Sequence, residues 1–245
     1  MTIMRRTKYI STPFWRLLLL AFIACSIALP ASAQRPRRAG DKSSTQAEVA
    51  SSIAPGDEAE LKQIVLLPPA ERIEKLKAFI EAHPESALKS RAQELIVSAR
   101  ASLGDEKLKS GDMRGGAEQF RLAVTESPAN MSDKLYTEII STLPLNLFLR
   151  GERAAALETA RLIEERVKDD PKRLLTLASF YLNIEEAGEA TRISELAIKL
   201  APGMAATHQA LGAAYHIALR LTDAANEYDA RDGMYAPPSG GSRKE

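Results

Sequence analysis

The sequence has almost no cysteine, because Cys25 is the only one among its 245 residues. A single thiol can form neither an intramolecular disulfide nor a thiolate zinc site. Only three histidines are present, and 33 basic residues nearly balance 32 acidic ones, for a formal net charge of +1. A chain this close to neutrality lacks the basic surplus that is typical of nucleic-acid-binding domains. The composition therefore excludes disulfide-rich scaffolds and favours neither nucleic acid nor anionic lipid as a partner.

The N-terminal 33 residues are organised differently from the rest of the chain. Four basic residues precede an uncharged run at 17–29, and Ala31-Ser32-Ala33 follows it. This order is typical of a cleaved secretory signal, so we expect residues 1–33 to be removed and the protein to be periplasmic or secreted. The run is shorter than the roughly 20 residues that a membrane-spanning helix needs, so we expect no stable transmembrane helix after cleavage. Two alternatives stay open, an uncleaved anchor and a lipoprotein modified at Cys25.

Cleavage after Ala33 would change the charge and remove the cysteine. It takes away four basic residues and no acidic ones, which leaves 29 basic and 32 acidic residues. Residues 34–56 are poor in large apolar side chains and rich in Ser, Ala, Pro and charge, so we expect a flexible leader there. Residues 236–245 contain Pro, Gly and Ser followed by charge, which predicts a flexible tail.

The segment between these ends has helical rather than strand periodicity throughout. Leu61, Ile64 and Val65 indicate a short helix before Pro68-Pro69, and Ile73, Leu76 and Ile80 indicate a second before His83-Pro84. A longer apolar series follows from 88 to 103. Each break is a Pro, a Gly or a short polar turn, so consecutive helices should fold back as antiparallel neighbours. The sequence predicts an all-α fold made of helical hairpins.

An internal repeat runs through the C-terminal half of the chain. Leu177, Ala178 and Tyr181 recur 34 residues later as Leu211, Gly212 and Tyr215. The stretch that begins at Leu103-Gly104 precedes Leu177-Ala178 by slightly more than two such periods, so one unit between them must be longer. We divide residues 57–235 into repeats at 97–130, 171–204 and 205–235, with a degenerate longer unit at 131–170 in which Pro144 and Gly151 should distort the turn.

With these positions the sequence resembles the tetratricopeptide repeat (TPR) family. The resemblance is carried by Leu103-Gly104, Gly111-Asp112, Phe120, Ala123 and Pro128, and again by Leu211-Gly212, Tyr215, Ala224 and Tyr228. It is partial in 171–204, where Ser194 replaces the expected aromatic, and poor in 131–170. It implies a solenoid, an α-α superhelix of antiparallel hairpins that acts as a scaffold for protein-protein interaction.

The spacing also has a packing explanation. Leu211, Gly212 and Tyr215 share one helical stripe with His208, so Leu211 should be core, and small residues at 178 and 212 should let paired helices approach closely. Since Ala178 occupies the position equivalent to Gly212, we expect Gly212→Ala to be tolerated and Gly212→Leu to overpack.

No catalytic or cofactor-binding constellation is recognisable, so we predict that the protein is not an enzyme and needs no cofactor. His208 and His216 lie on one predicted helix without further ligands at a recognisable spacing, which argues against a metal site. Neighbouring carboxylates such as Glu164-Glu165 point apart on a helix and suit acid-base chemistry poorly.

The candidate site is therefore a surface. The resemblance implies that the first helix of each hairpin lines a concave groove, with residues that lie off the core stripe. The candidates for binding a protein or peptide are Lys172, Leu175, Ser179, Asn183, Gln209, Ala213, His216, Asp105 and Lys109. We expect Leu175, with Leu182 and Ile217, to form an apolar centre that can be altered without loss of core. The alternatives are a structural or self-associating role in an envelope assembly or secretion complex, and service to an enzyme on another polypeptide.

Overall fold

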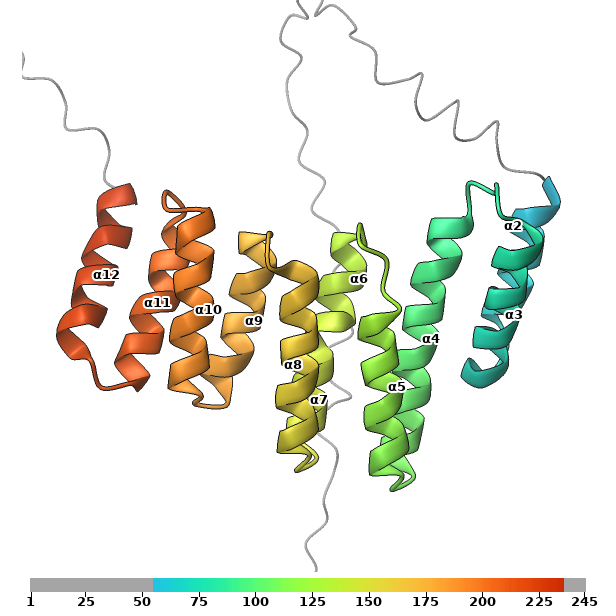
Figure 1. The fold of residues 1–245 in the computed structure, drawn as a ribbon, viewed down its shortest axis with the longest axis horizontal. Coiled ribbons are helices and arrows are strands. Elements are labelled where there is room, and N and C mark those ends of the chain that lie inside the picture. Colours follow the sequence, from blue (N-terminus) through green and yellow to red (C-terminus); the bar gives the residue numbers. More distant parts are fainter. Residues whose placement is uncertain (1–54, 236–245) are drawn as a thin grey trace, which may run out of the picture. The chain divides into compact units, whose positions relative to one another are not determined.

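The computed structural model describes residues 55–235 of the chain, and it is helical almost throughout (Figure 1). The predicted signal at 1–33, Cys25, nearly all of the leader and the tail at 236–245 lie outside the described residues. The helices are α2 (Pro55–Val65), α3 (Pro69–Ala82), α4 (Lys89–Lys109), α5 (Met113–Thr125), α6 (Asp133–Glu138), the 3-10 helix η1 (Ile140–Thr142), α7 (Leu143–Phe148), α8 (Arg153–Val167), α9 (Pro171–Asn183), α10 (Ala187–Leu200), α11 (Ala205–Ile217) and α12 (Leu221–Tyr235).

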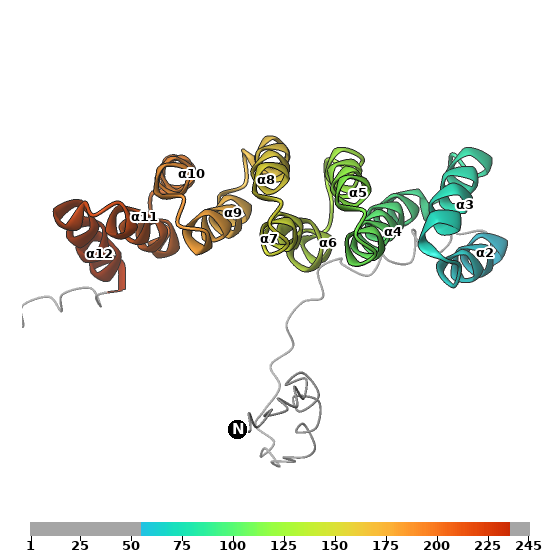
Figure 2. The same cartoon turned by 90° about the horizontal axis from the view of Figure 1, so that it is seen from below.

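Consecutive helices pack against each other as antiparallel hairpins. The pairs are α2 with α3, α4 with α5, α7 with α8, α9 with α10, and α11 with α12, while α6 and η1 precede α7 in the third hairpin. The second helices α3, α5, α8 and α10 form one row, and α4, α6, α7, α9 and α11 form the other (Figure 2). The predicted all-α, TPR-like array of hairpins is confirmed for the described residues.

The turns inside four hairpins share one backbone conformation. The residue with a positive φ is Gly111, Gly151, Glu185 or Leu219. The residue after it donates its backbone N–H to a helix carbonyl, as in Asp112 to Lys107 and Glu186 to Tyr181, at 2.9 Å in both. This is the bonding of a Schellman-type helix end, which satisfies carbonyls that the helix leaves free. From Gly151 onward these turns recur with the period of the sequence repeat, and the longer interval that precedes Gly151 falls where a longer unit was predicted.

The third hairpin differs from the others in its first helix and not in its turn. Its first helix is split into α6, η1 and α7, with Ile139 at φ −124° and ψ −70° between the first two. Pro144 is the second residue of α7, in the first turn, where the missing N–H costs nothing, but its ring cannot follow a continuous helical turn. The prediction that Gly151 distorts the turn was wrong, since Gly151, at φ +85°, makes the same turn as Gly111 at φ +90°.

The core runs through both rows of helices. One cluster joins α2, α3 and α4 and includes Leu76 and Phe79, and a second extends from α4 to α11 and includes Phe120 and Tyr181. Helix α4 contributes to both, with Ile96 on the first cluster and Val97 on the second. Leu211, predicted as core, is 4% exposed. Each hairpin therefore depends on its neighbours for burial, as expected of a repeat array.

In three hairpins a small residue of the first helix faces one particular residue of the second. A Cβ at Gly104 would lie 2.5 Å from Cδ1 of Phe120, and one at Gly212 would lie 2.5 Å from Cε1 of Tyr228. The equivalent pair in α9 and α10 is Ala178 with Ser194, and both are fully buried. Ala is accommodated at 178 in company with the small Ser194, so the close approach of Tyr228 argues against the expectation that Gly212→Ala is tolerated. An aromatic residue on the second helix therefore requires glycine at the facing position of the first helix, whereas a serine there leaves room for alanine.

Candidate functional site

The predicted surface residues lie on three first helices. Of these, α9 and α11 pack directly against each other, whereas α4 belongs to the hairpin on the other side of α6 and α7 (Figure 2). The exposed members are Lys172, Ser179 and Asn183 on α9, Gln209 and His216 on α11, and Lys109 on α4. Leu175, Ala213 and Asp105 are half-buried. We call the exposed residues of α9 and α11 the first-helix face.

On α9 the exposed and buried positions separate cleanly. Leu174, Leu177 and Tyr181 are at most 3% exposed and belong to the core, while Lys172 and Ser179 face solvent. The helix begins at a defined place, since the Asp170 side chain accepts hydrogen bonds from the backbone N–H groups of Lys172 and Arg173 at 3.0 and 3.1 Å. Such a cap fixes the first turn and with it the direction in which the face points.

Leu175 does not behave as a free surface residue. It and Leu182 are half-buried and pack against the core, and only Ile217 of the predicted apolar centre is exposed, at 37%. A change at Leu175 therefore removes buried apolar area, contrary to expectation. Charge-bearing substitutions that probe the first-helix face belong at Lys172, Ser179 or His216 instead.

Two of the candidate residues take part in contacts between helices. Gln209 accepts a hydrogen bond from the Arg231 guanidinium of α12, and Asp105 lies 3.6 Å from the Arg150 guanidinium, which follows α7. These contacts join α11 to α12 and α4 to the third hairpin. The side chains of Gln209 and Asp105 are thus already engaged in contacts within the protein.

The two histidines of α11 have different surroundings. His208 Nδ1 lies 2.7 Å from a Glu227 oxygen, and Nε2 lies 3.0 Å from the Pro202 carbonyl oxygen, so both ring nitrogens are engaged inside the last hairpin. His216 is exposed. Within residues 55–235, no group of three or more His, Cys, Asp or Glu side chains is placed to hold a metal ion. In the same range, no helix has the length and apolar character to cross a membrane.

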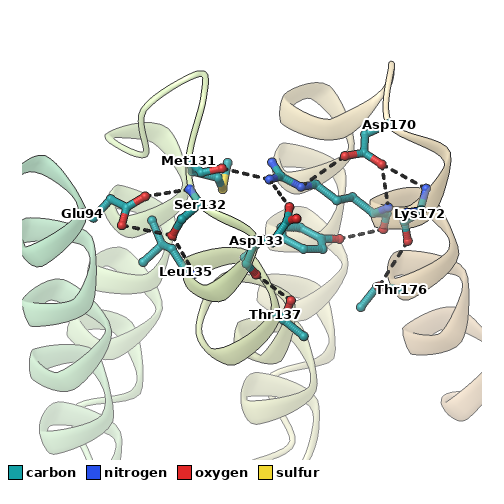
Figure 3. A network of polar contacts seen from close by, with 11 residues as sticks. Glu94, Met131, Ser132, Asp133, Leu135, Thr137, Asp170, Lys172 and Thr176 are labelled. Carbon is teal, nitrogen blue, oxygen red and sulfur yellow. Dashed lines mark hydrogen bonds and ion pairs between the residues drawn. The ribbon is translucent and has the colours of Figure 1, made fainter. Parts of the chain in front are cut away.

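Sequence reasoning missed a polar junction that holds α6 to α9 (Figure 3). The Arg173 guanidinium donates hydrogen bonds to the Met131 carbonyl and to Asp133, both at 2.8 Å, and it lies 3.3 Å from Asp170. The Tyr136 hydroxyl donates to the Arg173 carbonyl at 2.7 Å, and the guanidinium lies over the Tyr136 ring, 5.1 Å from its centroid. The hydrogen bond from Arg173 lowers the pKa of Asp133, and burial raises the pKa of Tyr136.

A second part of the same junction connects α6 to α4. Ser132 caps α6 by accepting a hydrogen bond from the Leu135 N–H at 3.1 Å, and its own N–H and hydroxyl donate to Glu94 of α4 at 2.6 and 3.0 Å (Figure 3). A Ser before a short helix is a recognisable cap. Its partner Glu94 belongs to the preceding hairpin and has no local signature in the sequence.

Two clefts lie in the row of second helices. One of about 750 Å³ lies between α5 and α8, and one of about 450 Å³ lies between α8 and α10. Glu158 lines both clefts, and none of the nine predicted site residues lines either. The α8–α10 cleft includes a bidentate ion pair in which Arg192 donates to Glu164 at 2.6 and 2.7 Å, and these bonds raise the pKa of Arg192. The predicted site and the clefts are thus separate features.

Comparisons with known proteins find likeness in structure only. No family model and no curated protein sequence matches the chain. A crystal structure of MamA is 18% identical, with 75% of this chain and 95% of that chain covered and a TM-score of 0.39. MamA 41-end from Desulfovibrio magneticus RS-1 is 14% identical over 75% and 97%, with a TM-score of 0.41. BtubC (BKLC) from P. vanneervenii is 17% identical over 83% and 97%, with a TM-score of 0.39. Likeness at this level assigns no function to the chain.

Proposed function

We propose that the chain is an exported TPR-type scaffold that binds a protein or peptide through the first-helix face and performs no catalysis of its own. The observation that carries the proposal is the separation of this face from the core. Lys172, Ser179 and His216 are exposed on two helices that pack against each other, while the neighbouring Leu174, Leu177 and Leu211 are buried. A surface of this kind can vary in sequence without cost to the fold, as an interaction scaffold requires.

Export rests on the pattern of the first 33 residues. A basic start, an uncharged run at 17–29 and the Ala31-Ser32-Ala33 sequence support a cleaved signal and a periplasmic or secreted protein. N-terminal sequencing of the protein purified from its own host tests this part, with Gln34 as the expected first residue. An intact Met1 or a lipid on Cys25 would replace it with a membrane-anchored form.

The binding proposal is tested by charge reversal on the first-helix face. Lys172→Glu with His216→Glu places two carboxylates there without removing buried apolar area. Lys75→Glu with Asn226→Glu is the matched control, since these exposed residues of α3 and α12 give the same change in charge. Each variant is immobilised and exposed to extract of the host, and bound proteins are quantified by mass spectrometry. Loss of a specific partner in the first variant alone is the expected result, and equal capture by both would reject the face.

The main alternative is a structural role in which the array associates with copies of itself. Light scattering over a hundred-fold range of concentration separates the two functions. A scaffold for other proteins keeps its monomer mass, whereas a self-assembling component gains mass with concentration in the absence of any partner. Lys172→Glu with His216→Glu would then show whether the same face serves self-association.

A further inference from the structure

The two clefts beside α8 carry an excess of unpaired negative charge. Six glutamates and four arginines line them. Arg121 pairs with Glu118 at 2.7 Å, Arg192 pairs with Glu164 and Glu189, and Arg161 lies 3.9 Å from Glu189. Among the described residues, Glu152, Glu158 and Glu165 have no ion-pair partner, and Arg114 is the one lining arginine without one. The clefts therefore offer three free carboxylates against a single free cation.

The larger cleft is lined by small and apolar side chains as well as by charged ones. Ala117, Ala154 and Ala155 line it together with Met113, and these small and apolar side chains leave room between α5 and α8. Thr159 also lines the cleft and is only 3% exposed, yet no hydrogen bond of the described residues involves its hydroxyl. A nearly buried hydroxyl without a protein partner normally has a ligand or water to bond. This hydroxyl is a second feature, independent of the acidic residues, that points to an occupant.

We propose that the clefts beside α8 bind an extended, arginine-rich segment of a partner protein. Guanidinium groups form bidentate hydrogen bonds with carboxylates, and their apolar stems suit a wall of Ala and Met. Glu158 and Glu165 lie two helical turns apart on α8, about 10 Å along its axis. Three residues of a polyproline II chain span about 9 Å and make one full turn, so the side chains at the first and fourth positions point to the same side. The fitting ligand therefore carries a basic residue at every third position.

This surface lies in the row of second helices, so the inference goes beyond the first-helix face and stands or falls separately from it. Its probe is the peptide acetyl-Arg-Ala-Ala-Arg-Ala-Ala-Arg-amide, titrated into the isotope-labelled chain that begins at Gln34. Amide shifts should concentrate on α5, α8 and α10. Binding should be weaker in 0.5 M than in 0.05 M salt, since exposed ion pairs are screened.

A variant pair decides whether the acidic residues act specifically. Glu158→Gln with Glu165→Gln should weaken peptide binding about ten-fold, as expected for the loss of two exposed ion pairs. Glu74→Gln with Glu81→Gln is the control, because these exposed residues of α3 have the same spacing along a helix and give the same charge change. The control should bind like the original chain, as should Lys172→Glu with His216→Glu. Equal loss in both glutamine pairs, shifts spread over other helices, or no binding at millimolar peptide in low salt would each overturn the proposal.

Discussion

Replacement of Gly212 by alanine should have opposite effects on stability according to the residue at 228. An added Cβ would lie 2.5 Å from Cε1 and 2.8 Å from Cδ1 of Tyr228, closer than van der Waals contact allows. Overpacking of this kind costs about 1 to 3 kcal/mol. Alanine gains about 1 kcal/mol over glycine inside a helix. The half-buried Tyr228 ring can move in part, so we expect a net loss of about 1 kcal/mol.

The same substitution should become favourable once the ring is removed. Tyr228→Ser recreates the pair found at Ala178 and Ser194, where no aromatic opposes the Cβ. In that background Gly212→Ala should gain about 1 kcal/mol from helix propensity alone. Urea unfolding of the four chains of this double-mutant cycle gives the coupling directly, and hydrogen exchange shows whether the change is confined to α11 and α12. An equal gain from alanine in both backgrounds would refute the steric explanation, because the ring would then have yielded without cost.

Further predictions concern the last turn, the core and two buried tyrosines. Leu219 has φ +59° and is 82% exposed, so Leu219→Gly should stabilise the last hairpin by about 1 kcal/mol in urea unfolding, and a loss would mean that the side chain is needed there. Leu211→Ala should cost about 2 to 5 kcal/mol, with exchange protection lost first in α11 and α12, and a uniform loss along the chain would contradict a repeat array. The Tyr181 hydroxyl is buried without a hydrogen-bond partner, so Tyr181→Phe should be neutral or stabilising at pH 7, whereas Tyr136→Phe should cost about 1 kcal/mol in thermal unfolding because it loses a hydrogen bond. Burial raises the pKa of Tyr181 to about 12, so the unfolded chain releases this proton first above pH 10, and stability should fall by up to about 3 kcal/mol between pH 10 and pH 12. Tyr181→Phe should flatten that alkaline decline, and an unchanged decline would assign it to other groups.

The fold was predictable because its determinants are local and repeated. A Leu with a small residue beside it, followed at fixed intervals by an aromatic and a proline, defines both the apolar stripe and the turns, so the period was visible in residues such as Leu177 and Leu211. The longer third hairpin was predictable because the spacing between Leu103-Gly104 and Leu177-Ala178 exceeds two repeat periods. The sequence did not reveal that the first helix of this hairpin is split, because a proline such as Pro144 is compatible with either a kink or the end of a helix.

The contacts that the sequence did not reveal join residues of different hairpins. Arg173 bonds to Met131 and Asp133 of the preceding hairpin, and nothing local to Arg173 distinguishes it from a solvated arginine. The phase of α9 was predicted closely enough to place Ser179 outside and Leu177 inside. Leu175 lies at the boundary of the stripe, where a small change in helix orientation separates half-buried from exposed. The exposure of residues at the edge of the stripe can be predicted only when the packing of the neighbouring helix is known.

Site-specific photo-crosslinking in the host tests the central claim most directly, because it reports contact with a partner at a chosen residue. A photoreactive residue is placed at Ser179 or His216 on the first-helix face, and at Glu74 or Glu81 on α3 as the control. The account predicts that the two first-helix positions crosslink to the same protein and that the α3 positions do not. Crosslinks to a protein from α3 alone, or from all four positions equally, would contradict a binding surface on the first helices.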